Sequence, residues 1–466
     1  MPERLTARAA IAALTTEFEE LTGAGTVDGA GDGPLSWGGY AESRARAAAR
    51  TGEAESVVHG LADVGGQRCV LVSFEFGFLG GSLGQRTGDR LVAAYEAART
   101  RSLPLVSLIA TGGSRMQEGM VALTQLQRVA GASARLRAAG PAQLAVLRDP
   151  TTGGGWATLG AGADVILALP GAQVGFAGSR VRPADADPRA YTAEGQLASG
   201  QIDAVVPPGE LPGTMAGWLR ALAPQPAPRP APVPDALSAT GLPATGWDAV
   251  RQARAASRPR AEAYLDAYFE HRLPLRGDRC GGTDPGLLCG FGRRDGRSIA
   301  YVAQCGTATR PAGYRTAARV VRLADRLGVP VLTLIDTPGA ANDAAAERAG
   351  AGAAIADAFA AVAAARVPLT TLVIGEGGSG GALALAAPGN THVTRDSYFS
   401  VIAPELAAAI LKRPPEEVRA TADQLRLRPQ DLVELGFARS VVGPAPGGGG
   451  EGDRNGDGSG DASRER

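Results

Sequence analysis

The chain has 466 residues, with 47 Lys or Arg against 47 Asp or Glu, so its formal net charge is zero. This length predicts two or three domains with well-developed cores. The sequence has no basic block and no basic patch interleaved with aromatic residues, which argues against a nucleic-acid partner. It shows no signal-peptide pattern and no apolar run near the roughly 20 residues that cross a bilayer. We therefore expect a cytoplasmic protein without membrane association.

Side chains that often carry catalysis are scarce. The chain has three histidines and one lysine, which leaves few candidates for a general base, a Schiff base or a histidine metal site. The lysine, Lys412, lies in ILKRPPEE, outside any glycine-rich turn, so no Walker-type phosphate loop is expected. The four cysteines form no C-x-x-C pair, and we interpret them as reduced, buried thiols rather than zinc ligands. No metal site is predicted.

In chain order, residues 1–34 are expected to form an amphipathic helix (Leu5 to Leu21) and then a flexible Gly/Asp connector. Residues 35–222 alternate strand and helix patterns and form the first predicted domain. Residues 223–243 are rich in proline and predict an extended linker. Residues 244–443 alternate again and form the second domain, and 444–466 lack apolar side chains and are predicted to be disordered. The alternation indicates an α/β class.

The two domains repeat one local pattern. LPLVSLIATGGSRMQEG from Leu103 matches VPVLTLIDTPGAANDAAAE from Val329, and PAQLAVLRDPTTGGGWATLG from Pro141 matches PLTTLVIGEGGSGGALALA from Pro368. Both copies read as a buried strand, a glycine turn and a helix, which predicts two like domains. The matched pairs are Pro104 with Pro330, Gly113 with Gly339, Asp149 with Glu376, and Gly154 with Gly381.

The glycine turns favour anion-stabilising backbone sites. Helix N-termini carry unpaired N–H groups and partial positive charge, and glycines let a ligand oxygen approach closely. Any one such turn could equally be an ordinary strand-to-helix connection. The carboxylates that flank the turns are best interpreted as caps or turn-stabilising groups; they are Glu118, Asp149, Asp336 and Glu376.

A serine hydrolase is disfavoured, although Ser379 stands in a G-x-S-x-G pattern. The same pattern surrounds Ser82, so it is not specific here. The hydrolase needs an acid and then a histidine after the serine. His392 follows Ser379 too closely, and no suitable acid lies between them.

Together these motifs resemble a known family. The first half resembles the β subunit of bacterial acetyl-CoA carboxylase carboxyltransferase through FEFGFLGGSLG, GGSRMQEGM, DPTTGGG and GFAGSRV. The second half resembles the α subunit through WDAVRQARAASRPRAEAYLD, RPAGYRTAARVVRLADRLGVPVLTLIDTPGA, GEGGSGGALALA and YFSVIAPE. The chain thus looks like a natural fusion of a β-like and an α-like half.

The resemblance implies a ClpP/crotonase-like ββα spiral in each of two tandem domains. It also implies transfer of a carboxyl group from carboxybiotin, held on a separate carrier protein, to the α-carbon of acetyl-CoA. The product would be malonyl-CoA, as in fatty acid biosynthesis. Biotin carboxylase and a biotin carboxyl carrier protein would act in trans within an ATP-dependent holoenzyme. At least a homodimer is expected, because the family's active site lies between facing protomers.

The same resemblance assigns site residues. The amides of Gly112 and Gly113 would hold the thioester oxygen, and those of Gly381 and Ala382 would hold the biotin carbonyl. Residues of two motifs would shape the biotin side: Asp336, Thr337, Pro338, Gly339, Ala340, Gly377, Gly378, Ser379 and Gly380. Phe176, Ala177 and Gly178 would line the coenzyme A side.

The chain departs from the family pattern in two places. Residues 1–34 contain no cysteine where the family β subunit usually carries a zinc ribbon, so no zinc is expected. Residues 303–314 are shorter than in the family and lack its lysine, so the family's ligand contacts from that stretch are not carried over to this chain.

Two other functions stay open. A biotin-independent malonyl-thioester decarboxylase is the alternative enzyme, and a non-catalytic scaffold is the third possibility. The second-half motifs favour the biotin-dependent reaction over both.

Overall fold

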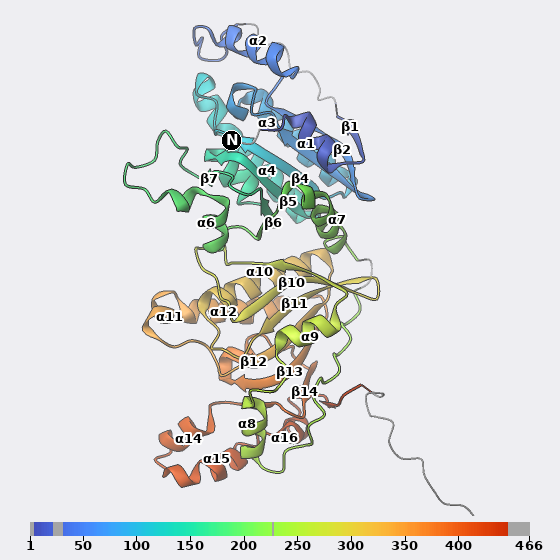
Figure 1. Ribbon diagram of the computed structural model, residues 1–466, viewed down its shortest axis with the longest axis vertical. Coiled ribbons are helices and arrows are strands. Elements are labelled where there is room, and N and C mark those ends of the chain that lie inside the picture. The colour runs from blue at the N-terminus through green and yellow to red at the C-terminus, as the bar shows by residue number, and fades with distance from the viewer. Residues whose placement is uncertain (1–3, 22–30, 226–227, 446–466) are drawn as a thin grey trace, which may run out of the picture.

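The computed structural model describes residues 4–21, 31–225 and 228–445. Figure 1 shows two halves that follow one another along the long axis, each built on its own sheet. The predicted tail falls almost wholly on residues 446–466, and most of the predicted connector on 22–30; both lie outside the described residues. None of the helices within the described ranges is long and apolar enough to span a bilayer.

The first sheet is mostly parallel and has the strand order β1-β2-β3-β4-β5-β6-β8, with β7 paired to β5. Its first two pairings are antiparallel and the others are parallel. The strands are β1 (Glu17–Glu20), β2 (Val57–Val64), β3 (Gln67–Phe74), β4 (Leu105–Thr111), β5 (Gln143–Thr152), β6 (Val165–Ala168), β7 (Val174–Gly175) and β8 (Ala204–Val205). Every residue of β4 is buried, as suits a central parallel strand covered on both faces.

The second sheet has the order β16-β14-β13-β12-β11-β10-β9, with β15 paired to β13. Again the pairings next to one edge are antiparallel and the rest parallel. The strands are β9 (His271–Leu275), β10 (Leu287–Arg294), β11 (Arg297–Gln304), β12 (Val331–Thr337), β13 (Leu369–Gly378), β14 (Thr391–Thr394), β15 (Tyr398–Ser400) and β16 (Val441–Val442). The predicted α/β class is confirmed in both halves.

Helices cover the sheets. In the first half they are α1 (Ala7–Leu14), α2 (Tyr40–Thr51), α3 (Gln85–Arg101), α4 (Gly119–Ala138), α5 (Gly153–Gly155), α6 (Ala193–Ala198) and α7 (Leu211–Ala221). In the second half they are α8 (Gly246–Arg254), α9 (Ala261–Tyr268), α10 (Pro311–Leu327), α11 (Ala344–Arg348), α12 (Ala351–Ala364), α13 (Ser379–Leu383), α14 (Pro404–Ile410), α15 (Val418–Gln424) and α16 (Pro429–Glu434). Helix α10 starts with Pro311 and ends at the left-handed Gly328, as the sequence rules for helix ends predict.

The strand register fixes how the two copies correspond. Ile109 pairs with Leu147 before a bulge and Thr111 with Thr151 after it. In the second sheet Ile335 pairs with Val373, and after the same bulge Thr337 pairs with Gly377. An offset of 226 residues therefore relates α3, β4 and β5 to α10, β12 and β13. It keeps the predicted pairs of Pro104 with Pro330 and Gly113 with Gly339. It corrects the other two, because Gly155 corresponds to Gly381 and Pro150 to Glu376.

The N-terminal segment belongs to the first domain, which corrects the expected boundary at residue 35. The helix ends at Leu14, and β1 then pairs with β2 at the edge of the first sheet. The order α1–β1 matches α9–β9 in the second half. The strand Glu17–Glu20 has the sequence EFEE and is mostly exposed. Because no apolar alternation marks it as a strand, the sequence predicts one helix from Leu5 to Leu21 instead.

The proline-rich linker is packed rather than loose. From residue 228 to 243 it has neither helix nor ladder strand. Ala231 is buried in the second-half core, and its carbonyl accepts a hydrogen bond from Thr370 Oγ1 at 2.9 Å. The Tyr268 hydroxyl donates to the carbonyl of Pro232 at 2.8 Å. The linker is therefore tied along the second half.

The two halves share one continuous core. Helix α7 of the first half packs on the second sheet, where Trp218 meets Phe291 edge-on with ring centroids 6.4 Å apart. Also between the two halves, the fully buried Asp203 pairs with Arg279 and, at 3.0 Å, with Arg319. Burial raises the pKa of Asp203, but the two guanidinium charges outweigh it and hold the pKa below its ordinary value.

This ion pair predicts a defined loss of stability. Asp203→Asn should lower the free energy of unfolding by about 3 kcal/mol, because it leaves two arginines facing a neutral side chain inside the protein. Chemical denaturation of the full chain measures this. Glu42→Gln, which removes an exposed pair with Arg46, is the control and should change little.

The pH dependence gives a second readout on the same pair. A lowered carboxyl pKa contributes stability above the unfolded-state value of about 4, and that contribution disappears as the pH falls through the folded-state pKa. The stability difference between wild type and Asp203→Asn should thus be full at neutral pH and shrink below about pH 4. A difference that is constant with pH would contradict the assignment.

Candidate functional site

The first glycine turn lies at the carboxyl end of β4. Gly113 has a φ of 109°, a left-handed value that favours glycine. Its carbonyl accepts from Leu83 N at 2.9 Å, and the position where its Cβ would stand is 3.6 Å from Gly153 Cα. The turn therefore sits directly against the start of α5. The N–H groups of a helix's first turn have no acceptor within that helix, so α5 faces amides toward this place.

The predicted donors of this turn already have acceptors. Gly112 N–H donates to the Gly80 carbonyl at 2.9 Å, and Gly113 N–H donates to Thr111 Oγ1 at 3.0 Å. The second bond is to a rotatable hydroxyl and can be exchanged for a ligand oxygen at a net cost of about 1 kcal/mol. The first belongs to a backbone pairing. Gly113 is thus the freer of the two donors.

Phe176, Ala177 and Gly178 lie beside the same turn. The Phe176 carbonyl accepts from Gly153 N at 3.0 Å, while the Phe176 side chain is 72% exposed. Arg182 Nε donates to the Ala177 carbonyl at 3.1 Å and its guanidinium stacks on the ring of Tyr191. The structure therefore brings this predicted segment next to the first turn.

A buried charge network supports the first turn from behind. Arg115, two residues after Gly113, pairs with Glu55 and with Glu118, and all three side chains are buried. Glu118 also accepts from the Tyr40 hydroxyl and from the amide of Gln85 at the start of α3. This agrees with the interpretation of Glu118 as a capping carboxylate. The network joins α2, α3 and the turn.

The second glycine turn repeats the geometry at the end of β12. Gly339 has a φ of 138°, its N–H donates to Thr337 Oγ1 at 3.1 Å, and its carbonyl accepts from Thr309 N at 3.0 Å. A Cβ on Gly378 would overlap the backbone of Pro338, and a Cβ on Gly381 would overlap the backbone of Ala340. The motifs DTPGA and GEGGSGGALALA, far apart in sequence, thus form one backbone-on-backbone contact.

The predicted residues at the start of α13 differ in solvent exposure. Ser379 has a φ of 57° and is exposed, and Gly380 has open space where a Cβ would stand, whereas Ala382 is fully buried. The side chain of Asp336, a residue predicted to shape the biotin side, acts here as a turn-stabilising carboxylate, in line with the interpretation of the carboxylates that flank the turns. It is completely buried, because Arg258 donates to both of its carboxylate oxygens (2.9 and 2.8 Å).

Asp336 instead organises the loop. Arg260 is a second partner at 3.1 Å, and the amide of Glu376 donates to the same carboxylate at 3.1 Å. Glu376 in turn accepts from the Tyr398 hydroxyl at 2.7 Å and pairs with Arg254 at 2.8 Å. Both carboxylates of the turn are therefore engaged structurally, and neither is an unpaired base.

Family models match both halves. The model described as "Carboxyl transferase domain" matches residues 33–205, and "Acetyl co-enzyme A carboxylase carboxyltransferase-like" matches residues 242–456. Among relatives, the acetyl-coenzyme A carboxylase carboxyl transferase subunits beta/alpha of Salinispora arenicola is 40% identical, over 85% of this chain and 75% of its own length. The protein of that name from Saccharopolyspora erythraea is 37% identical, over 94% and 81%.

The chain belongs to the acetyl-CoA carboxylase carboxyltransferase family. Coverage of both halves in one relative also confirms the predicted fusion of a β-like with an α-like half. The chain is an enzyme of the carboxyltransferase class.

Solved structures agree on the fold of this carboxyltransferase. Transcarboxylase 12S, in a structure with hydrolysed methylmalonyl-coenzyme A bound, has a TM-score of 0.77 at 22% identity and covers 95% of this chain and 87% of its own. A single-chain, multi-domain long-chain acyl-CoA carboxylase has a TM-score of 0.72 at 21% identity and covers 94% of this chain and 44% of its own. The tandem crotonase-like fold is thereby confirmed.

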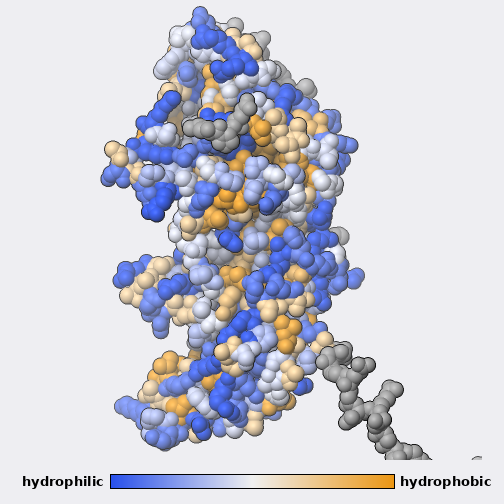
Figure 2. All heavy atoms as spheres, in the orientation of Figure 1, coloured by the Kyte–Doolittle hydropathy of each residue, from blue (hydrophilic) through white to orange (hydrophobic). Residues whose placement is uncertain are grey.

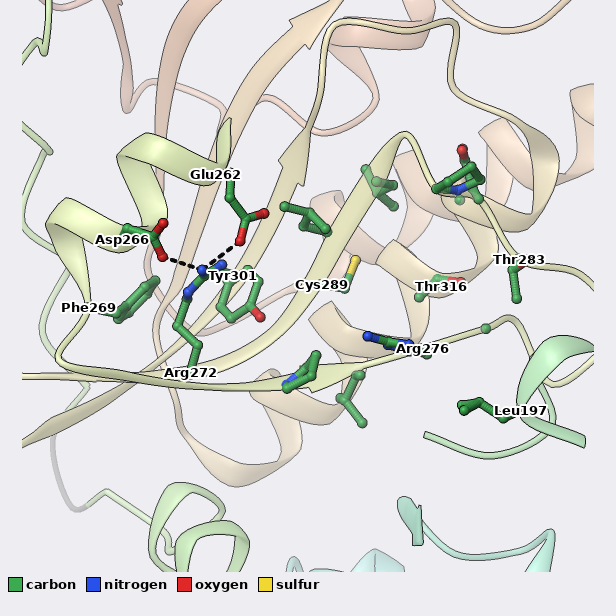
Figure 3. A pocket seen from close by; sticks show the side chains of 18 of the residues that line it. Leu197, Glu262, Asp266, Phe269, Arg272, Arg276, Thr283, Cys289, Tyr301 and Thr316 are labelled. Carbon is green, nitrogen blue, oxygen red and sulfur yellow. Dashed lines mark hydrogen bonds and ion pairs between the residues drawn. The ribbon is translucent and has the colours of Figure 1, made fainter. Parts of the chain in front are cut away.

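A large furrow of the carboxyltransferase lies away from both turns. It has a volume of about 970 Å³ and is lined by α6, α9, β9 and β10 (Figure 3). In it Arg272 points to Glu262 and Asp266, which both accept from its guanidinium. The furrow contains none of the predicted site residues.

The other side chains considered as catalytic or metal-binding candidates do not lie at the glycine turns. The His392 ring contacts Ser440 Oγ at 2.9 Å, rather than Ser379. Within residues 4–21, 31–225 and 228–445, no cluster of three or more His, Cys, Asp or Glu side chains could hold a metal ion. Of the four cysteines, Cys69 and Cys289 are buried as predicted, but Cys280 is exposed.

Sequence reasoning missed the supports of both turns. Arg258 and Arg260 stand in ARAASRPRAEAY, and no spacing rule linked them to Asp336, some 76 to 78 residues away. The role of Gly155 was hidden by the one-residue error in the repeat alignment. The family motif DPTTGGG, which contains Gly155, was the available signal.

The close backbone contact at Gly381 predicts that one added methyl group lowers thermal stability there but not at Gly380. Gly381→Ala should lower the thermal unfolding temperature by several degrees, because the new Cβ overlaps the Ala340 backbone and the Tyr314 hydroxyl. Gly380→Ala, in the same short helix, should be neutral or slightly stabilising, since nothing lies near its Cβ. Differential scanning fluorimetry checks both. Equal effects of the two substitutions would contradict the contact.

Proposed function

We propose that the chain moves a carboxyl group from carboxybiotin, borne on a separate carrier protein, to the α-carbon of an acyl-CoA. The proposed substrate is acetyl-CoA and the product malonyl-CoA. The names of the relatives support acetyl-CoA, and their coverage of both halves supports a carboxyltransferase that contains a β-like and an α-like half. Biotin carboxylase and the carrier protein are proposed as partners that act in trans.

The observation that carries this proposal is the duplicated backbone turn. Each half presents main-chain amides at the junction of a strand end and a short helix, with charged side chains turned inward as supports. Transfer of a carboxyl group between two carbonyl compounds develops negative charge on two oxygens in turn. Preorganised amides are suited to stabilising such charge, and loss of one donor typically costs a factor of about 10²–10³ in rate.

On the acyl side, the first turn is proposed to hold the thioester oxygen. Gly113 N–H becomes available when Thr111 Oγ1 rotates away, and the first amides of α5 lie next to it. Phe176 is proposed to cover the coenzyme A side, since an aromatic ring exposed over such a turn can pack against a ligand. Gly112 keeps its bond to Gly80 and would hold the turn in place.

On the other side, the second turn is suited to a ureido carbonyl oxygen on which negative charge develops. Open space beside Gly380 and the exposed backbone of Ser379 leave room for a planar ring, and the amides of Gly381 and Ala382 are the proposed donors. When bound, biotin supplies the carboxyl group and a ureido nitrogen basic enough to take the α-proton. The chain's residues would orient the ring, fix the carbonyl oxygen and exclude water.

We further propose that the complete site forms between two copies of the chain. No hydrogen bond among the described residues joins the first turn to the second. Large apolar side chains are exposed in each half: Met116 and Phe176 near the first turn, and Val401 and Ile410 elsewhere in the second half. Figure 2 shows apolar surface over α14 at the outer end of the second half. A second copy would cover these surfaces and bring unlike turns together.

The reaction is tested in reverse with purified protein, malonyl-CoA and free biotin. We expect release of acetyl-CoA only when biotin is present, and a rate at least about 10²-fold lower for Gly113→Ala, which alters a proposed oxyanion donor. Acetyl-CoA is measured by a coupled assay. Release at the same rate without biotin would contradict the proposal and would favour the decarboxylase.

The two-copy site is tested by complementation. Gly113→Ala and Gly381→Ala chains are inactive alone, but random mixed dimers should recover about a quarter of wild-type activity, since half the dimers carry one intact site of two. The matched control mixes Gly153→Ala with Gly113→Ala. A Cβ on Gly153 would stand 3.0 Å from Gly113 Cα, so every site keeps a defective first turn and no recovery is expected. Absence of recovery in the first mixture, with mixed dimers shown by mass spectrometry, would place both turns of a site in one chain.

A further inference from the structure

The carbonyl oxygen of Gly381 is held by side chains rather than by the helix in which it lies. The Tyr314 hydroxyl donates to it at 2.9 Å, and Gln304 Nε2 donates at 3.4 Å. The amide that would close the next helical turn, Leu385 N–H, donates to Ala382 instead. The oxygen therefore depends on Tyr314 and Gln304 for its partners.

Both donors are fixed in the interior. Tyr314 is 1% exposed and Gln304 is fully buried. Gln304 Nε2 also donates to Thr309 Oγ1 at 3.0 Å, next to the second turn. Burial raises the pKa of Tyr314, so the hydroxyl keeps its proton and remains a donor at all ordinary pH values. The other amide atom of Gln304, Oε1, is buried without a partner among the described residues.

This support reaches the proposed donor through one peptide group. The Gly381 carbonyl and the Ala382 N–H belong to the same planar amide, so holding the oxygen sets the direction of the N–H. Hydrogen bonds received by a carbonyl also polarise its amide and strengthen the N–H as a donor. Two buried donors on the Gly381 oxygen therefore act on the N–H of Ala382.

The first half lacks this arrangement, although it has the same turn. The offset of 226 residues places Gly88 where the second half has Tyr314, and the side chain of Gln125 fills the space beside it. The strand register places Phe74 where the second half has Gln304. At Gly155, which corresponds to Gly381, the position of an added Cβ meets the methyl group of Thr111 and the side chain of Leu83, whereas at Gly381 it meets the Tyr314 hydroxyl. A need of the fold alone would be common to both copies.

We propose that Tyr314 and Gln304 are positioning residues of the second turn, which aim and polarise the Gly381–Ala382 amide toward the ureido oxygen of biotin. This inference rests on the proposed function. It distinguishes the two turns. In the second turn, side-chain hydrogen bonds to the Gly381 carbonyl strengthen the Ala382 N–H as a donor. In the first turn, the Gly113 N–H instead exchanges its bond to Thr111 Oγ1 for a ligand oxygen. Neither Tyr314 nor Gln304 touches the substrate.

The test is Tyr314→Phe, which removes only the hydroxyl. In biotin-dependent decarboxylation of malonyl-CoA we expect kcat to fall about 3- to 10-fold, the effect of one hydrogen bond, with KM for malonyl-CoA unchanged. Gln304→Met removes the longer bond and should lower kcat less. The control is Tyr268→Phe, which removes a part-buried tyrosine hydroxyl that donates to the carbonyl of Pro232 at 2.8 Å, and it should leave kcat unchanged.

The outcomes separate this inference from the proposed function. Biotin-dependent turnover by the wild type with unchanged kcat in both Tyr314→Phe and Gln304→Met would overturn the inference alone. A fall that Tyr268→Phe shares, or a parallel rise of KM for malonyl-CoA, would assign Tyr314 a general structural role and overturn it as well. Biotin-independent turnover by the wild type would overturn both proposals. Because the two variants remove different side chains, a folding defect in one leaves the other to decide.

Discussion

Close packing of one backbone segment against another determines the shape of the glycine turns in this protein. In the second half, the strand end at Gly378 and the short helix at Gly381 lie against the turn from Pro338 to Ala340 so closely that a single methyl group would not fit. In the first half, a Cβ on Gly153 would stand 3.0 Å from Gly113 Cα, and a Cβ on Gly155 would overlap the side-chain methyl group of Thr111. Glycine is required there by space, and at Gly113 and Gly339 by backbone angle as well. The consequence is a surface of amides rather than of side chains.

Such a surface needs rigid support, and each half provides it differently. Behind the first turn, Arg115 binds two carboxylates and thereby joins α2, α3 and the turn. Behind the second, Asp336 joins two arginines and the Glu376 amide. Removing one partner of such a buried pair is costly, although the pair itself contributes little net stability. We interpret both networks as devices that fix loop geometry.

The connection between the halves has the same character. The ion pairs of Asp203 with Arg279 and Arg319 join the first half to the second, as does the apolar contact of Trp218 with Phe291. Each chain therefore carries its two turns on one continuous core. If unlike turns of two copies meet, as we propose, the distance between the two sites of a dimer is set by this intrachain contact.

The sequence by itself determined the α/β class, the duplication, the family and the position of both glycine turns. These follow from local patterns, since buried strands, glycine turns and helix starts each leave a short signature. It interpreted Asp336 as a cap or turn-stabilising carboxylate but did not identify its partners, because the arginines that bury it lie some 76 to 78 residues earlier. It also missed the strand Glu17–Glu20, whose charged residues show no alternation and which exists only through pairing with β2.

Only the tertiary structure decided the register of the repeat and the supports of the turns. A one-residue choice between Gly154 and Gly155 cannot be made from similar strings of glycine, whereas strand pairing on both sides of a bulge settles it. The bonds from Tyr314 and Gln304 to Gly381 span 67 and 77 residues. No local pattern encodes such bonds, because they arise where a helix, a strand and a turn pack together, and that packing exists only in the folded chain.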